Sequence, residues 1–180
     1  KFDATIMSTT APGTGFDVLT SVTAQSISGT GNSFYGALVA AEAAISTAGY
    51  SVNGYAMSPQ GRAEMLTAFD GNDRPLFINS VADGSIQRLL GQPVYYTKGV
   101  YKAGSGSGSV DVLGFVGDWS KAMYGIVEGV DISISDQATL TISNSQVNLW
   151  ERNMFAVRAE IEVGFVAEAT AFNKITRAHA

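Results

Sequence analysis

The most constraining feature of this 180-residue sequence is a run of strict alternation near its end. Apolar residues stand at every second position from Phe155 to Phe165, and the charged residues Arg158, Glu160 and Glu162 lie between them. This spacing matches the two-residue period of a β-strand, whereas a helix would scatter the charges around its circumference. We therefore expect a long strand inside a sheet, with its apolar face buried and its other face toward solvent or a partner.

Further strands are predicted ahead of this run. Residues 130–135 and 139–143 also alternate apolar with polar side chains, which favours two half-buried strands joined by a turn around Asp136. Other strand candidates, bounded by turn-forming residues, are residues 54–57, 92–97 and 110–116.

Two helices are predicted among these strands. From Ser33 onward, apolar residues and alanines recur near helical spacing; Ser33 or the residue before it can cap the start, and Gly49 can end the helix. Ser58 followed by Pro59 supplies an N-cap and a proline at the first helical position, which predicts a second helix through Leu66.

The remaining segments have the composition of loops. Residues 1–32 are rich in Gly, Ser and Thr and indicate loops with short strands, residues 70–75 form a dense turn signal, and residues 103–109 indicate a flexible surface loop. The helices are too few for a doubly wound parallel sheet. We expect an α+β fold with mostly antiparallel sheets.

Composition excludes several classes of function. Only 15% of the residues are charged and the net charge is -5, so the chain lacks the basic surface that grips nucleic acid phosphates. Cysteine is absent, which excludes disulfides, thiolate metal sites and cysteine nucleophiles. No apolar run approaches the ~20 residues of a membrane span. The sequence begins at Lys1 without a recognisable signal peptide, and we expect a fragment or a processed product.

Motifs for nucleophilic or phosphate chemistry are weak. The single histidine, His179, is the penultimate residue, where chain ends fray, so neither a catalytic triad nor a multi-histidine metal site can be built. The glycines at residues 13–15 and 104–108 are not followed by Gly-Lys-Ser/Thr and open no periodic helix, which argues against a phosphate loop.

One pair of acidic residues has a spacing that is compatible with catalysis. Glu160 and Glu162 would lie roughly 7 Å apart on one strand face, a separation that could suit glycoside cleavage. Because Arg158 shares that face, a charged ladder toward solvent or another subunit is the better interpretation.

Two further clusters have simpler explanations than binding. The turn at residues 70–75 lacks the twelve-residue calcium pattern with its terminal glutamate, so we expect a hairpin turn there. Tyr95, Tyr96 and Tyr101 are interleaved with a single lysine, Lys98, too few cations for a single-strand platform, so we expect these tyrosines to pack. We predict no enzyme, and no catalytic, cofactor or metal site.

The order of several segments is recognisable. They read GYAMSP at 54–59, DGNDRPLF at 70–77, LLGQPV at 89–94, GFVGDWS at 114–120 and NMFAVRAE at 153–160, with Ala171-Phe172 near the end. Together they resemble the major capsid protein family of tailed double-stranded DNA bacteriophages, the Hong Kong 97 type. The resemblance spans about residues 33–175.

The resemblance implies an architecture. Family members share an axial domain at the capsomer centre, a peripheral domain, an N-terminal arm, an extended loop and a spine helix. Residues 1–32 would then lead in from the peripheral domain, residues 33–127 would form the axial domain, and residues 128–180 would hold the return strands of the peripheral domain. The chain would begin after the interlocking arm, loop and helix, and would alone stay monomeric or form small oligomers. Ala169 departs from the family pattern, where many members have proline.

Some family members crosslink covalently. A lysine of the extended loop joins an asparagine of the peripheral domain, assisted by a glutamate, and Asn153 and Glu160 match the last two positions. The same residue types occur in members that do not crosslink, and the lysine partner is not in this chain. We therefore expect no reaction from these two residues alone, because an amide is inert without a dry, organised site.

The resemblance also implies the function. The chain would be a structural subunit of an icosahedral phage or prophage capsid that assembles into capsomers and encloses packaged DNA. Its partners would be other copies of itself in hexamers and pentamers, and portal and scaffolding proteins, with no membrane and no specific nucleic acid. The protein would be located in the virion and assembled in the bacterial host cytoplasm. Two alternatives stay open: an encapsulin-like nanocompartment shell, and a secreted β-rich binding domain favoured by the Ser/Thr/Gly composition.

Overall fold

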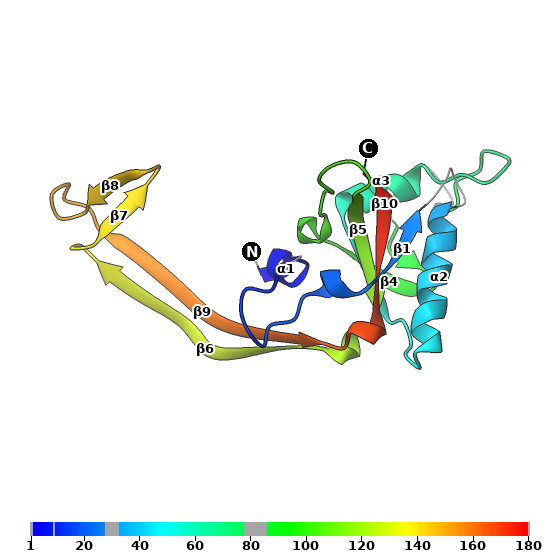
Figure 1. The fold of residues 1–180 in the computed structure, drawn as a ribbon, viewed down its shortest axis with the longest axis horizontal. Helices are drawn as coiled ribbons and strands as arrows, with labels where there is room; N and C mark the ends of the chain where they lie inside the picture. The colour runs from blue at the N-terminus through cyan, green and yellow to red at the C-terminus, as the bar shows by residue number, and fades with distance from the viewer. Residues whose placement is uncertain (1, 9, 28–32, 78–85, 180) are drawn as a thin grey trace. The chain divides into compact units, whose positions relative to one another are not determined.

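The structure is a computed structural model that describes residues 2–8, 10–27, 33–77 and 86–179 (Figure 1). The chain divides into two compact units. We call Lys1–Met123 together with Phe165–Ala180 the core unit, and Tyr124–Gly164 the ribbon unit.

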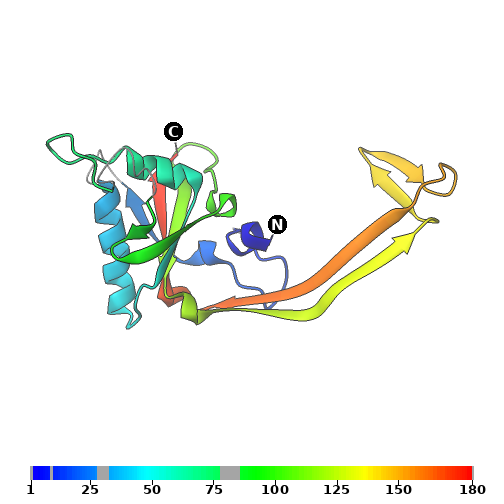
Figure 2. The same cartoon turned by 180° about the vertical axis from the view of Figure 1, so that it is seen from behind.

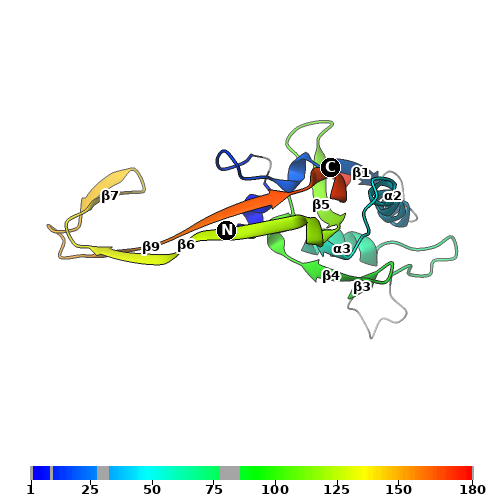
Figure 3. The ribbon, with the colours of Figure 1, turned by 90° about the horizontal axis from the view of Figure 1, so that it is seen from below.

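The core unit is built on a six-stranded sheet with the order β1-β10-β5-β2-β4-β3. Its strands are β1 (Thr23–Ile27), β2 (Gly54–Met57), β3 (Arg88–Leu89), β4 (Gln92–Tyr96), β5 (Val110–Gly117) and β10 (Phe172–Ala178). The β10/β5, β5/β2 and β4/β3 pairs are antiparallel, while β1/β10 and β2/β4 are parallel. Seen from below, β3 and β4 lie at one edge of the unit and β1 toward the other (Figure 3). The predicted α+β class is confirmed, and the predicted strands at 54–57, 92–97 and 110–116 are present.

Two helices pack on one face of this sheet. They are α2 (Ser33–Thr47) and α3 (Pro59–Leu66), close to the bounds predicted from the sequence. Gly49 takes a φ of 87°, a left-handed conformation that suits the end of a helix. Ser58 caps α3: its Oγ accepts a hydrogen bond from the Gly61 N–H at 2.9 Å and donates one to the Leu113 carbonyl at 2.8 Å. Leu38 and Ile45 of α2 are fully buried in the core on this face.

The N-terminal segment packs on the opposite face. It contains a short helix, α1 (Phe2–Ile6), and a 3-10 turn, η1 (Leu19–Ser21). Figures 1 and 2 agree that the sheet lies between α2 and α1. Met7 and Leu19 pack there with Phe115 and Phe172 in a second hydrophobic cluster. The helix α1 was not expected, because its few residues carry neither an N-cap signal nor a helical apolar period.

The ribbon unit pairs its strands differently from the sequence prediction. Its elements are β6 (Ala122–Ser135), β7 (Thr139–Ile142), β8 (Ser145–Asn148) and β9 (Ala156–Ala167), of which β6 and β9 extend into the core unit. The expected hairpin between residues 130–135 and 139–143 is wrong, because β6 pairs with β9 and β7 pairs with β8. Ser143 and Asn144 both adopt positive φ, as a tight two-residue hairpin turn requires, so β7 closes locally on β8. The long strand β6 therefore pairs with the long strand β9, which runs beside it in the opposite direction (Figure 1).

The apolar face of β9 is also not buried as predicted. The strand itself is present, but Phe155, just before it, is 69% exposed and Ile161 is 52% exposed; within the predicted run only Phe165, which belongs to the core unit, is buried. The physical reason is that a two-stranded sheet has only one neighbour per strand and no second layer to cover a face.

The expected three-part division does not coincide with the two compact units. β1 from residues 1–32 and β10 from residues 128–180 both pair in the sheet that holds β2, β4 and β5, so backbone hydrogen bonds join all three parts. The assignment of axial and peripheral domains stays a prediction. No helix within the described ranges is long and apolar enough to cross a membrane.

Candidate functional site

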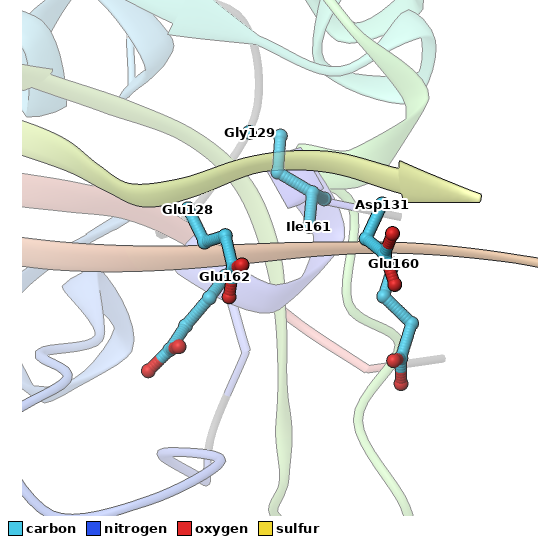
Figure 4. Close-up of a pocket in the computed structure, with 6 residues that line it drawn as sticks. All are labelled: Glu128, Gly129, Asp131, Glu160, Ile161 and Glu162. Atoms are coloured by element: carbon cyan, nitrogen blue, oxygen red, sulfur yellow. The ribbon is translucent and has the colours of Figure 1, made fainter. Parts of the chain in front are cut away.

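The first candidate surface is the apolar face of the ribbon unit. On β9 the apolar residues alternate with Arg158, Glu160 and Glu162, and on β6 they alternate with Asp131 and serines. Because Asp131 lies on the same side as Glu160 (Figure 4), the apolar residues of both strands share the other side. Five side chains of this face are more than half exposed, namely Val130, Ile132, Ile134, Val157 and Ile161, and so is Phe155 just before β9. A contiguous face of exposed apolar side chains marks an interaction surface.

The opposite face of the ribbon unit gathers carboxylates. Glu128 and Asp131 of β6 and Glu160 and Glu162 of β9 line a shallow hollow of about 340 Å³, with their carboxylates on one side of the strands (Figure 4). Arg158 forms an ion pair with Glu160, which raises the pKa of the Arg158 guanidinium through a hydrogen bond and charge. The predicted charged ladder is therefore present.

The ion pair beside this hollow is open to water. Both partners of the Arg158–Glu160 ion pair are more than half exposed, so water screens them. Within the described ranges, no group of three or more His, Asp or Glu side chains is arranged to hold a metal ion. An exposed, charged surface of this kind suits electrostatic contact with a partner.

The crosslink candidates lie apart within one chain. Asn153 has a φ of 53° in the exposed segment before β9, and its backbone N–H donates to the Trp150 carbonyl at 3.2 Å. Glu160 lies four residues into β9, and from Ala156 to Glu160 the strand rise alone covers roughly 13 Å. A single chain therefore does not assemble the asparagine and glutamate into one reaction site.

The C-terminal end is held in place, so the expectation that His179 lies in a frayed end is wrong. The His179 backbone N–H donates to the Ser109 carbonyl at 3.0 Å, and its Nδ1 lies 2.7 Å from Oδ1 of Asp111, which is 2% exposed. Asp111 also accepts hydrogen bonds from the Gly104 N–H at 2.9 Å and Arg177 Nη2 at 3.1 Å. The Gly104 N–H and His179 hold the pKa of Asp111 below its usual range. This cluster fastens the last strand to the loop before β5.

The turn at residues 70–75 is a hairpin-like turn, as expected. Oδ1 of Asp70 accepts hydrogen bonds from the backbone N–H groups of Asn72 and Arg74, both at 2.8 Å, and Asp73 takes a φ of 57°. The carboxylate is thus occupied by its own turn.

A groove in the core unit was not found from the sequence. It encloses about 640 Å³ and is lined by residues from α1, β2, β4 and the turn after β5, among them Asp3, Ala56, Pro93, Tyr95, Thr97 and Trp119. Tyr95 is 68% exposed, so the expectation that it packs is wrong, whereas the Tyr96 hydroxyl donates to the Ile86 carbonyl at 2.7 Å.

Trp119 forms a fixed wall of this groove. Its Nε1–H donates to the Gly54 carbonyl at 3.0 Å, and its ring meets the Phe172 ring edge-to-face at 5.2 Å between centroids. The groove depends on the register that sets Ala56 beside Tyr95 across the β2/β4 pair. No local sequence motif carries that signal.

Comparison with known proteins decides among the open interpretations. Residues 6–176 match the sequence model of the Phage capsid family. The chain belongs to this family. A probable major capsid protein of Mycobacterium phage D29 is 32% identical over 119 residues, which cover 61% of this chain and 35% of that relative.

Solved structures share the fold of this phage capsid family member. A chain from Mycobacterium phage Ogopogo matches with a TM-score of 0.73 at 17% identity, covering 98% of this chain and 63% of that one. A chain from the capsid of a native GTA particle matches with a TM-score of 0.61 at 16% identity, covering 97% and 65% of the two chains. The chain thus spans about a third of the curated relative and somewhat less than two thirds of these structures.

The comparisons confirm the phage capsid resemblance inferred from the sequence, and with it the capsid-type fold. The alternative of an unrelated secreted binding domain is wrong, because nearly the whole chain falls within the capsid family.

Proposed function

We propose that this chain is a structural subunit of an icosahedral phage or prophage capsid. The observation that carries the proposal is the family match over residues 6–176, together with a relative described as a probable major capsid protein. In this role the chain binds other copies of itself in hexamers and pentamers, meets portal and scaffolding proteins, and assembles in the bacterial host cytoplasm. Its task is mechanical enclosure of DNA and not catalysis.

The physical character of the chain supports a shell subunit. A surface with few charges is covered by neighbours at little desolvation cost, because fewer charged groups must leave water. The exposed apolar side chains of the ribbon unit, such as Ile132 and Phe155, would be covered in an assembled particle. The net charge of -5 disfavours adhesion of packaged DNA to the subunit.

The two units suggest a domain assignment. We assign the core unit to the axial domain at the capsomer centre and most of the ribbon unit to the peripheral domain, in place of boundaries at residues 32 and 127. The support is that β1 and β10 complete the sheet of the core unit, while the ribbon unit has its own strand pairs. Asn153 and Glu160, in the ribbon unit, stay candidate crosslink positions, which need groups from other copies to react.

Expression of the complete open reading frame in which these 180 residues are encoded, from its own start codon to its stop codon, tests the proposal. Electron microscopy of the purified product should show uniform closed shells in which this chain is a principal component by mass spectrometry. A product that stays monomeric across the micromolar range, with no particles, would contradict a role as a shell subunit. Co-purification of an enclosed enzyme in place of DNA would favour the nanocompartment alternative.

A further inference from the structure

The outward face of α2 has almost no charge. The exposed positions of this helix include Tyr35, Val39, Ala40 and Ala43, and its only charged residue, Glu42, is half-buried. A helix on the surface of a soluble domain ordinarily carries charged residues on its outer face, whereas a helix that is apolar all round is covered on all sides. The composition of α2 therefore indicates a second covering layer.

The groove lined by Tyr95 and Trp119 lies on the other face of the same sheet. Tyr55 and Met57 point into the hydrophobic cluster beneath α2, so Ala56 between them points to the opposite face, where it lines the groove with its register partner Tyr95. The core unit thus has a nearly uncharged helix on one face and an apolar groove on the other.

We propose that α2 of one copy docks into the Tyr95–Trp119 groove of the next copy, in a head-to-tail contact. This inference rests on the proposed function and names one surface through which the copies bind. Because the two surfaces lie on opposite faces of one unit, each copy can use both at once, and repetition of the same contact closes a ring when the rotation between copies permits it.

The two surfaces match in charge. The described lining of the groove contains one charged side chain, Asp3, whose Oδ2 already accepts a hydrogen bond from the Thr97 hydroxyl at 3.3 Å. Exposed Lys98, which follows Thr97 at the end of β4, offers a cation for Glu42 of α2. Docking therefore buries little uncompensated charge.

The outer face of α2 is long and built largely of small residues. The fifteen-residue helix α2 is roughly 22 Å long, and its outer face offers Tyr35 and Val39 with small residues between them, which let the groove approach closely. Such a contact covers less than the ~800 Å² per partner of a stable standard interface. The affinity of one such contact is low, but the assembly is stable when many copies repeat the contact, as a shell requires.

Paired cysteines test the contact, because the 180 residues contain no cysteine of their own. The variant Ala43→Cys/Tyr95→Cys is made in the product of the encoding reading frame and treated with a short bis-maleimide. We expect a ladder of covalent dimers, trimers and larger oligomers on a denaturing gel. A mixture of the two single variants should stop at dimers, and each single variant alone should give none.

Matched variants separate the possible outcomes. Asn72→Cys/Tyr95→Cys, with an exposed turn position in place of α2, should lose the ladder. Dimers from Ala43→Cys alone would mean that two α2 faces meet, and would overturn the proposal. Shells seen by electron microscopy without a ladder would also overturn it while leaving the proposed function intact. A ladder without any shells would support the contact and contradict the proposed function.

Discussion

The core unit and the ribbon unit differ in where their strands place apolar residues and in what covers them. In the core unit, β5 and β10 direct apolar residues to both faces of a sheet, and each face is covered by another layer, so that Phe115 and Ile175 are fully buried. In the ribbon unit, β6 and β9 carry apolar residues on one face with nothing from the described chain over them, and Ile132 and Phe155 stay exposed.

The difference shows that a strand pattern encodes which face is to be covered but not which part of the assembly covers it. In the core unit, the covering layers come from the same 180 residues. In the ribbon unit, the covering would come from the assembled particle under the proposed function. The free energy of unfolding of the separate chain should therefore depend on substitutions in the core unit and change little with substitutions in the ribbon unit.

The largest expected effect is the loss of stability when a charge is placed on a buried strand of the core unit, compared with the same change on a strand of the ribbon unit. Ile175→Asp in β10 buries an unpaired carboxylate at a fully buried position and should cost more than about 4 kcal/mol, enough to unfold the core unit. Ile161→Asp in β9 alters a side chain that is 52% exposed and should change stability by no more than about 0.5 kcal/mol. Urea denaturation followed by circular dichroism measures both. Equal losses from the two variants would contradict the contrast between the units.

A methyl group added to glycine should give the next largest effect. In Gly117→Ala the new Cβ would overlap the Phe172 ring and lie 2.6 Å from the Ala171 carbonyl oxygen, so we expect a loss of about 1–3 kcal/mol. Gly125→Ala in β6 is the matched control, because nothing lies within 4 Å of its added Cβ. Thermal melts should show a lower Tm for the first variant and an unchanged Tm for the second. A comparable drop in both would mean that the ribbon unit is packed.

Acid should weaken the core unit through Asp111. Its pKa is lowered in the folded state by the Gly104 N–H and by His179, so the ionised carboxylate stabilises the fold above its unfolded pKa of about 3.9. This contribution is lost as the pH falls through the lower folded pKa, because the proton then binds the folded state as well. Between pH 7 and pH 3, Tm should fall more for the parent chain than for Asp111→Asn. Parallel pH profiles would show that Asp111 contributes nothing to the acid response.

The smallest expected effect is in the glycine-serine loop. Deletion of residues 105–107 removes exposed residues while Gly104 keeps its hydrogen bond to Asp111, so stability should stay within about 1 kcal/mol of the parent. Differential scanning calorimetry provides the comparison. A loss of several kcal/mol would show that the loop is packed, and the interpretation of residues 103–109 as a flexible surface excursion would be wrong.

Local chemistry allowed much of the core unit to be predicted from the sequence. The Ser58-Pro59 pair specified the start of α3, and Gly49 marked the end of α2, because caps and left-handed conformations depend on neighbouring residues alone. The strand pairing of the ribbon unit could not be predicted in the same way. The turn at Ser143 and Asn144 lacks glycine, so it carried no strong hairpin signal, and residues 139–143 were paired with the preceding run 130–135 instead of with β8.

The candidate sites also differ in whether local sequence or distant strand pairing determines them. The charged ladder around Glu160 followed from alternation within one strand, which is local. The groove beside Trp119 requires β2 and β4, separated by about 40 residues in the chain, to pair in parallel register. His179 was assigned to a frayed end because no local pattern reveals that Asp111 lies beside it.

Hydrogen–deuterium exchange tests the contrast between the two units most directly. In the dispersed chain, amides of β5 and β10 should exchange slowly because both faces of their sheet are covered, while amides of β6 and β9 within residues 124–164 should exchange fast. In purified particles the ribbon unit should become as protected as the core unit. Strong protection of residues 124–164 already in the dispersed chain, or fast exchange that persists in the particles, would contradict the account.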